Sequence, residues 1–128
     1  MPTKLTTALL LLSLTVCAGC AAVFVGAGAG VYTYTSGELK RTYNAPFDKA
    51  VGDSLAALHD LKITVVNKNS KGITTTINAE KSDQTPVTVK VIIRGANLTE
   101  VSVRTGVVGV WDKKVSELIH AHIAKRLQ

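Results

Sequence analysis

Cys20 is the residue whose type and setting point most directly to chemistry. Its thiolate would be a strong nucleophile, and the two residues before it, Ala18 and Gly19, are small enough to leave the backbone open to a peptidase. The segment upstream is typical of a secretory signal peptide, because Met1–Lys4 carries a positive charge and Leu5–Val16 is an apolar run. We therefore expect a signal peptide at the start of the chain, followed by small residues that lead into a cysteine.

The sequence Ala18-Gly19-Cys20 resembles the lipobox of bacterial lipoproteins, although the position three residues before the cysteine, where the pattern prefers Leu, Val or Ile, holds Cys17. In a lipobox the thiol carries a diacylglycerol and the chain is cut just before the cysteine. The resemblance implies that residues 1–19 are a signal peptide and that Cys20 is a lipidated N-terminus. Two or three acyl chains hold a protein firmly on a membrane.

An uncleaved membrane-spanning helix is the alternative for the same segment. No charged side chain occurs from Leu5 to Gly37, which leaves room for a span of about 20 residues. Gly26 and Gly30 have the spacing of a helix-packing motif. However, the glycines of this run weaken a helix. We therefore expect residues 20–30 to be the lipidated cysteine followed by a Gly/Ala-rich spacer.

Strand and helix patterns begin after this spacer. Val31–Thr35 and Glu38–Tyr43 are rich in β-branched and aromatic residues and flank Ser36-Gly37, which predicts a hairpin. A helix is expected to begin at Pro46, because proline is tolerated in a first helical turn. Its predicted apolar face consists of Phe47, Val51, Leu55, Leu58 and Leu61.

The remaining elements are four strands and a second helix. Residues 63–66, 72–80, 86–94 and 98–107 alternate as strands do, with 67–71 as a turn. The helix is expected from Asp112, a suitable N-cap, to Leu127. The predicted core positions are Ile73, Thr75, Ile77, Ala79, Val87, Val89, Val91, Ile93, Val101, Val103, Thr105 and Val107 on the strands, and Val115, Leu118, Ile119, His122 and Ile123 on the helix.

Together these patterns predict a two-layer α+β fold within one domain, residues 31–128. Its antiparallel sheet would have about five or six strands, with two helices packed on one face. Trp111, which comes just before the last helix, is expected to close the end of the core, and a surface anchor is the alternative.

Neither a metal site nor a catalytic centre is predicted. His120 and His122 are two positions apart on a helix, so their side chains diverge by roughly 200°, and His59 lies on the other helix without a cysteine or paired glutamates beside it. The glycine-rich run lacks the spacing of a phosphate-binding loop. The processed chain would have no thiol, no Gly-x-Ser-x-Gly and no close carboxylate pair. We therefore expect no cofactor, no metal and no enzymatic activity.

The charge distribution suggests a binding face. The chain has a net charge of +6 and few aromatic residues, 5%, which favours anionic partners and disfavours nucleic acid, where bases stack on aromatic rings. Lys90, Arg94 and Arg104 are predicted to lie near one another on the outer face of the sheet. This face is either an anion or partner-binding surface or the solvated side of a two-layer fold.

The stretch Gly37-Glu38-Leu39-Lys40-Arg41-Thr42-Tyr43-Asn44-Ala45-Pro46-Phe47-Asp48-Lys49, with the lipobox and the Leu55–Leu61 helix, resembles a family of small bacterial lipoproteins of unknown function. The resemblance implies an envelope location, and Ala21 after the cysteine implies the outer membrane, facing the periplasm. The expected function is a non-enzymatic domain, held on the membrane by Cys20, that binds or supports an envelope protein or an anionic partner. The alternative is a small apolar-ligand carrier with a pocket between sheet and helices.

Overall fold

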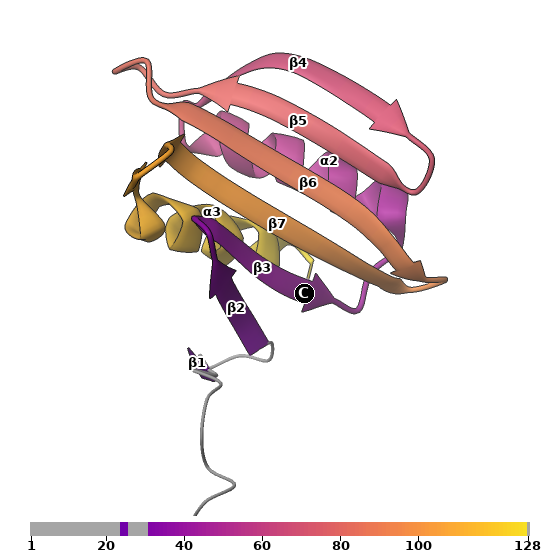
Figure 1. Cartoon of the computed structure of the whole chain (residues 1–128). Coiled ribbons are helices and arrows are strands. Elements are labelled where there is room, and N and C mark those ends of the chain that lie inside the picture. Colours follow the sequence, from indigo (N-terminus) through magenta and orange to yellow (C-terminus); the bar gives the residue numbers. More distant parts are fainter. Residues whose placement is uncertain (1–23, 26–30, 128) are drawn as a thin grey trace, which may run out of the picture.

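The computed structural model describes residues 24–25 and 31–127 (Figure 1). The predictions for the signal peptide and Cys20 lie outside these residues. The elements, in chain order, are β1 (Phe24–Val25), β2 (Val31–Thr35), β3 (Glu38–Tyr43), α2 (Phe47–Asp60), β4 (Thr64–Lys71), β5 (Thr74–Glu80), β6 (Pro86–Gly95), β7 (Leu98–Val107), β8 (Val110–Trp111) and α3 (Lys113–Arg126).

The predicted α+β class is confirmed, but the sheet is larger than expected. Its strands follow the order β1-β2-β3-β7-β6-β5-β4, with β8 paired to β7 outside this path, and neighbouring strands are antiparallel. Six strands were predicted, and the described residues add β1 and β8. Each of these has only two residues, too few for an alternating pattern, and β1 lies within the predicted spacer.

Local sequence signals placed the first hairpin and both helix starts correctly. The turn between β2 and β3 puts Ser36 at φ 52° and Gly37 at φ 78°, the pair of positive angles that a tight two-residue hairpin requires. Helix α2 begins directly after Pro46. Asp112 caps α3, because its side chain accepts a hydrogen bond from the backbone N–H of Val115 at 3.1 Å.

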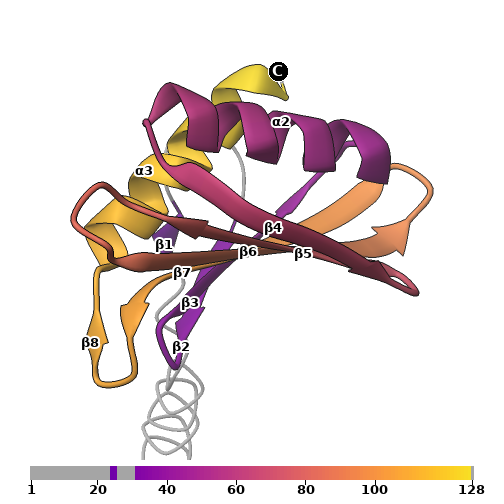
Figure 2. The same cartoon turned by 90° about the horizontal axis from the view of Figure 1, so that it is seen from above.

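Both helices lie on the same side of the sheet (Figure 2). The space between the layers is filled by a continuous cluster of buried side chains, to which both helices and four of the strands contribute. Burial of each large aliphatic side chain contributes about 1.5–3 kcal/mol. The fully buried aliphatic members of this cluster include Leu58, Ile77, Val89, Val91, Val101, Val103, Ile119 and Ile123.

Three predictions at strand ends were wrong. Residues 67–71 continue strand β4, where a turn was expected. Ile73 and Val107 were assigned to the core but are 58% and 56% exposed. Ile73 follows Gly72 in the β4–β5 turn, and Val107 lies where β7 turns into β8. At such positions the chain has already left the covered part of the sheet, although the alternating pattern continues through them.

Trp111 does not close the core. It pairs with Gly106 across the β7–β8 hairpin, which projects from the side of the sheet opposite the helices (Figure 2). Its ring lies against Gly37, and the guanidinium of Arg104 lies 5.2 Å from the ring centroid. The indole therefore supports the base of the hairpin.

Candidate functional site

The predicted binding face lies on the outer side of the sheet, and the structure brings two of its three residues together. Arg104 on β7 is in register with Thr88 on β6, two positions from Lys90. Arg94 lies four positions beyond Lys90 along β6, beside a register shift near the end of the strand. The surface therefore has one basic pair and one separate arginine.

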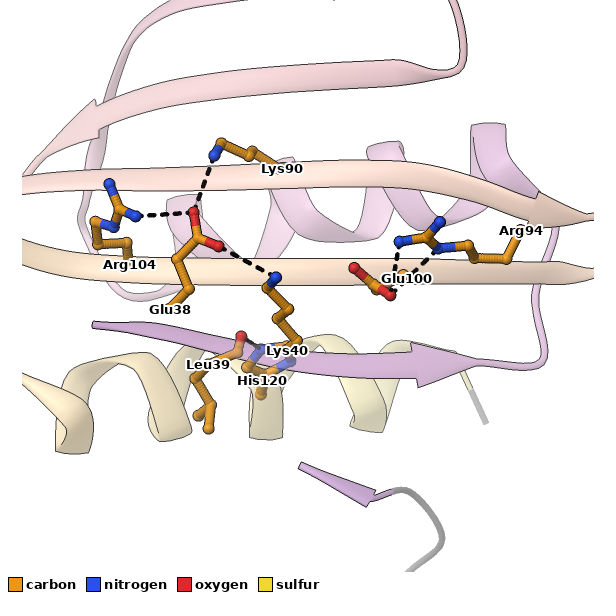
Figure 3. A network of polar contacts seen from close by, with 8 residues as sticks. All are labelled: Glu38, Leu39, Lys40, Lys90, Arg94, Glu100, Arg104 and His120. Atoms are coloured by element: carbon orange, nitrogen blue, oxygen red, sulfur yellow. Dashed lines mark hydrogen bonds and ion pairs between the residues drawn. The ribbon is translucent and has the colours of Figure 1, made fainter. Parts of the chain in front are cut away.

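Glu38 on β3 is the centre of the basic pair (Figure 3). Its Oε1 accepts hydrogen bonds from Lys90 Nζ at 2.9 Å and Arg104 Nη2 at 3.0 Å, and its Oε2 lies 3.5 Å from Lys40 Nζ. Partial burial raises the pKa of Glu38, but the hydrogen bond from Lys90 and the charges of the three cations outweigh it and lower the pKa below its usual value. Glu38 is therefore an anion held among three cations.

Arg94 has an acidic partner of its own. Its Nε and Nη2 donate to the same oxygen of Glu100, at 3.2 Å and 3.1 Å (Figure 3). Glu38 and Glu100 thus compensate part of the positive charge of the predicted binding face. An external anion at this surface would compete with a carboxylate already in place.

Sequence reasoning missed Glu38 because its neighbours come from distant strands. Glu38 is opposite Arg104 in the β3–β7 register, a pairing between residues 66 positions apart. The alternation of β3 places Glu38 and Lys40 on the same face as each other. It does not indicate which strand lies alongside.

Glu38→Gln is expected to destabilise the domain by about 1 kcal/mol, because three cations would lose the anion that they share. The loss is no larger because the cations are partly exposed, so solvent screens the repulsion between them. Glu100→Gln is the matched control, with one arginine partner, and should cost about half as much. Urea unfolding at low and high salt would measure both losses. Equal losses for the two variants, or a Glu38→Gln loss that salt does not reduce, would contradict the three-cation arrangement.

A second polar cluster lies in the core and is centred on His120. Its Nε2 lies 2.7 Å from the carbonyl oxygen of Leu39, and its Nδ1 lies 2.7 Å from the hydroxyl of Tyr43. A carbonyl can only accept, so Nε2 carries the proton and Nδ1 of the neutral ring accepts from Tyr43. Burial lowers the pKa of His120 to about 4, although the bond to Leu39 opposes the shift.

The residues around this cluster explain why His120 is buried, although it was not among the predicted core positions of the helix. The Arg41 guanidinium lies 4.8 Å from the Tyr43 ring centroid and 5.0 Å from that of Tyr32, and Tyr32 meets the His120 ring edge-on. Helix α3 buries His120, while the predicted core residue His122 is only half-buried and Leu118 is 47% exposed. An imidazole can be buried in the core when both its ring nitrogens have hydrogen-bond partners.

The three histidines are dispersed. His120 is enclosed in the core, whereas His122 Nδ1 lies 4.0 Å from Asp60 Oδ2 and His59 is exposed on α2. The same oxygen of Asp60 pairs with Arg126. Within residues 24–25 and 31–127, no group of three side chains is placed to hold a metal ion.

Two open pockets lie at the periphery of the domain. One, of about 760 Å³, adjoins the C-terminal end of α2 and the start of β4. The other, of about 470 Å³, lies beside β8. Neither lies between the sheet and the helices. The first is lined by His59, Asp60, Lys62, Ile63, Thr64 and Val65, and the second by Lys81, Asp83, Thr85, Gly106, Val110, Trp111, Asp112, Lys113 and Lys114.

These features define a small α+β domain with a packed core and an outer sheet face crossed by ion pairs. The chain belongs to the DUF3568 family of proteins of unknown function, whose model matches residues 4–126. The comparison with curated proteins gives no match. None of the helices in the described part of the chain is long and apolar enough to cross a membrane.

Proposed function

We propose that this protein is a lipid-anchored component of the bacterial cell envelope. In this proposal residues 1–19 are removed, Cys20 carries the lipid, and the domain faces the periplasm from the outer membrane. The observation that carries the proposal is the sequence order of a basic start, an apolar run and Ala18-Gly19-Cys20. The domain then binds or supports another envelope component without catalysing a reaction.

The way the domain uses its polar groups supports a binding or structural role. Glu38 and Glu100 are held in ion pairs, and both ring nitrogens of His120 have partners inside the core. A general acid or base must instead reach a substrate from a pocket. The buried imidazole serves packing, and the outer face offers a broad, largely compensated polar surface to a partner.

No observation on the described residues favours the alternative of a small apolar-ligand carrier. That function requires a cavity between sheet and helices, where Leu58, Val89 and Ile119 belong to one packed cluster. A partner is better accommodated on the surface of the domain.

The intact mass of the protein extracted from membranes tests the anchor. The wild type should begin at Cys20 and carry added acyl mass, because the thiol and the new N-terminus are the sites that a lipoprotein acylates. Cys20→Ser should lack that mass. Cys17→Ser is the matched control and should be processed as the wild type is.

A full-length, unmodified wild-type chain would overturn the anchor and favour the spanning helix. The outer-membrane location is tested separately by density-gradient fractionation of membranes. Recovery of the acylated protein with the inner membrane would contradict it.

A further inference from the structure

The tip of the β7–β8 hairpin is the most exposed apolar feature among the described residues. Val107, Val108 and Val110 are 56%, 89% and 72% exposed. They occur within four consecutive positions around the turn at Val108–Gly109. Three exposed valines on a short turn have no role in the core described above.

The hairpin is held in a projecting position. It stands on the side of the sheet opposite the helices, as does the β2–β3 turn (Figure 2). At its base Gly106 has φ 106°, and the carbonyl of Val110 lies where a side chain of Gly106 would be. Trp111 packs on Gly37 next to this point. The backbone and the indole together fix the direction in which the hairpin projects.

Basic residues surround the base of the hairpin. Lys81, Lys113 and Lys114 line the pocket beside β8. Two carboxylates share this pocket: Asp83 lies 3.4 Å from Lys81, and Asp112 caps α3. Lys113 lies 3.6 Å from Glu117 on the next turn of α3. Lys114 is exposed and has no acidic partner among the residues that the structure describes. An exposed apolar tip with lysines at its base is an arrangement that interfacial membrane binding uses.

We infer that this hairpin tip docks into the headgroup region of an anionic phospholipid bilayer, with the valines at the acyl boundary and the lysines at the phosphates. The inference rests on the proposed anchor, because the twelve residues from Cys20 to Val31 span at most about 40 Å and keep the domain beside the membrane. Anionic lipids attract lysines near the surface.

The shape of the feature favours a bilayer over a protein partner. A stable protein interface uses about 800 Å² on each side, usually across a fairly flat face. The three valines form a narrow, convex tip that stands clear of the sheet. A bilayer can close around such a protrusion because its headgroups and acyl chains rearrange.

The test uses the full chain in vesicles and its only tryptophan, Trp111, as the reporter. Vesicles of phosphatidylethanolamine and phosphatidylglycerol with brominated acyl chains should quench Trp111, and phosphatidylcholine vesicles with the same label should quench it less. Val108→Asp should reduce the quenching about threefold or more, since a carboxylate resists the acyl boundary. Val66→Asp is the matched control, at a valine 62% exposed on β4, and should leave the quenching unchanged.

Flotation of the vesicles separates this inference from the proposed anchor. A chain that floats without quenching of Trp111, or with equal quenching in both valine variants, overturns the docking while the anchor stands. Quenching in a preparation whose mass shows no acyl group supports the docking and overturns the anchor. A concentration-dependent shift of Trp111 emission without vesicles, lost in Val108→Asp, would assign the tip to a second copy of the chain and overturn the inference.

Discussion

His120→Ala is expected to destabilise the domain by about 3–4 kcal/mol at pH 7.5. The substitution empties a fully buried position and removes the donor to the Leu39 carbonyl and the acceptor for the Tyr43 hydroxyl. A cavity and an unsatisfied buried acceptor both cost stability. Urea unfolding followed by far-UV circular dichroism would measure the loss. His122→Ala, on the same helix but half-exposed, should cost about 0.5 kcal/mol or less.

The loss in His120→Ala should also depend on pH. Burial lowers the pKa of His120 to about 4 in the folded state, against about 6.5 in an unfolded chain. The unfolded state therefore binds more protons between these values, so the contribution of His120 is complete above pH 6.5 and is lost as the pH falls toward 4. The difference amounts to about 3 kcal/mol.

The stabilities of wild type and His120→Ala should accordingly converge between pH 6.5 and 4. Acidic groups elsewhere titrate in both proteins and cancel in the difference. Two parallel curves across this range would show that the imidazole is not held neutral by its surroundings.

Gly106→Ala is the second substitution with a large expected effect, a loss of about 3 kcal/mol or more. Gly106 has φ 106°, and an added Cβ would meet the Val110 carbonyl and lie 3.3 Å from Trp111 Cα. Both neighbours are backbone atoms of the paired strand, so relief requires the β7–β8 hairpin to move. Thermal unfolding of the full chain measures the loss.

Gly109→Ala separates the cost of the positive φ from the cost of the close backbone contact. Gly109 also has a positive φ, 86°, but no atom lies within 4 Å of an added Cβ. The Gly109→Ala variant should therefore lose about 1 kcal/mol of stability, because alanine adopts a left-handed backbone less readily than glycine. Similar losses at Gly106 and Gly109 would mean that the close approach to Val110 contributes nothing.

The parts of the fold that sequence predicted correctly are those whose cause is local. Ser36-Gly37 forms the hairpin turn, Pro46 precedes α2, and Asp112 caps α3. Each depends on the conformational preference or hydrogen bonding of one or two residues. Such preferences act wherever the segment is placed in the fold.

The errors arose where the outcome depends on distant partners. Glu38 gathers Lys90 and Arg104 only because β3 pairs with β7. His120 on α3 is buried because Tyr43 and the Leu39 carbonyl, both on β3, satisfy its ring. Periodicity specifies faces and not neighbours, so it could place Lys90, Arg94 and Arg104 on one face but could not find that Glu38 joins Lys90 and Arg104.

Under the proposed lipid anchor, the position of β2 has a mechanical consequence. Its register with β3 comprises Thr33, Tyr34 and Thr35, and its first residue, Val31, is at the end of the hairpin away from the turn. Tension on the preceding chain would break these residue pairs one after another, starting from the end of β2 away from the turn. Peeling β2 would release about 17 Å of extended chain while β3 remains paired with β7. The strand would thus act as an extensible element that yields before the core is loaded.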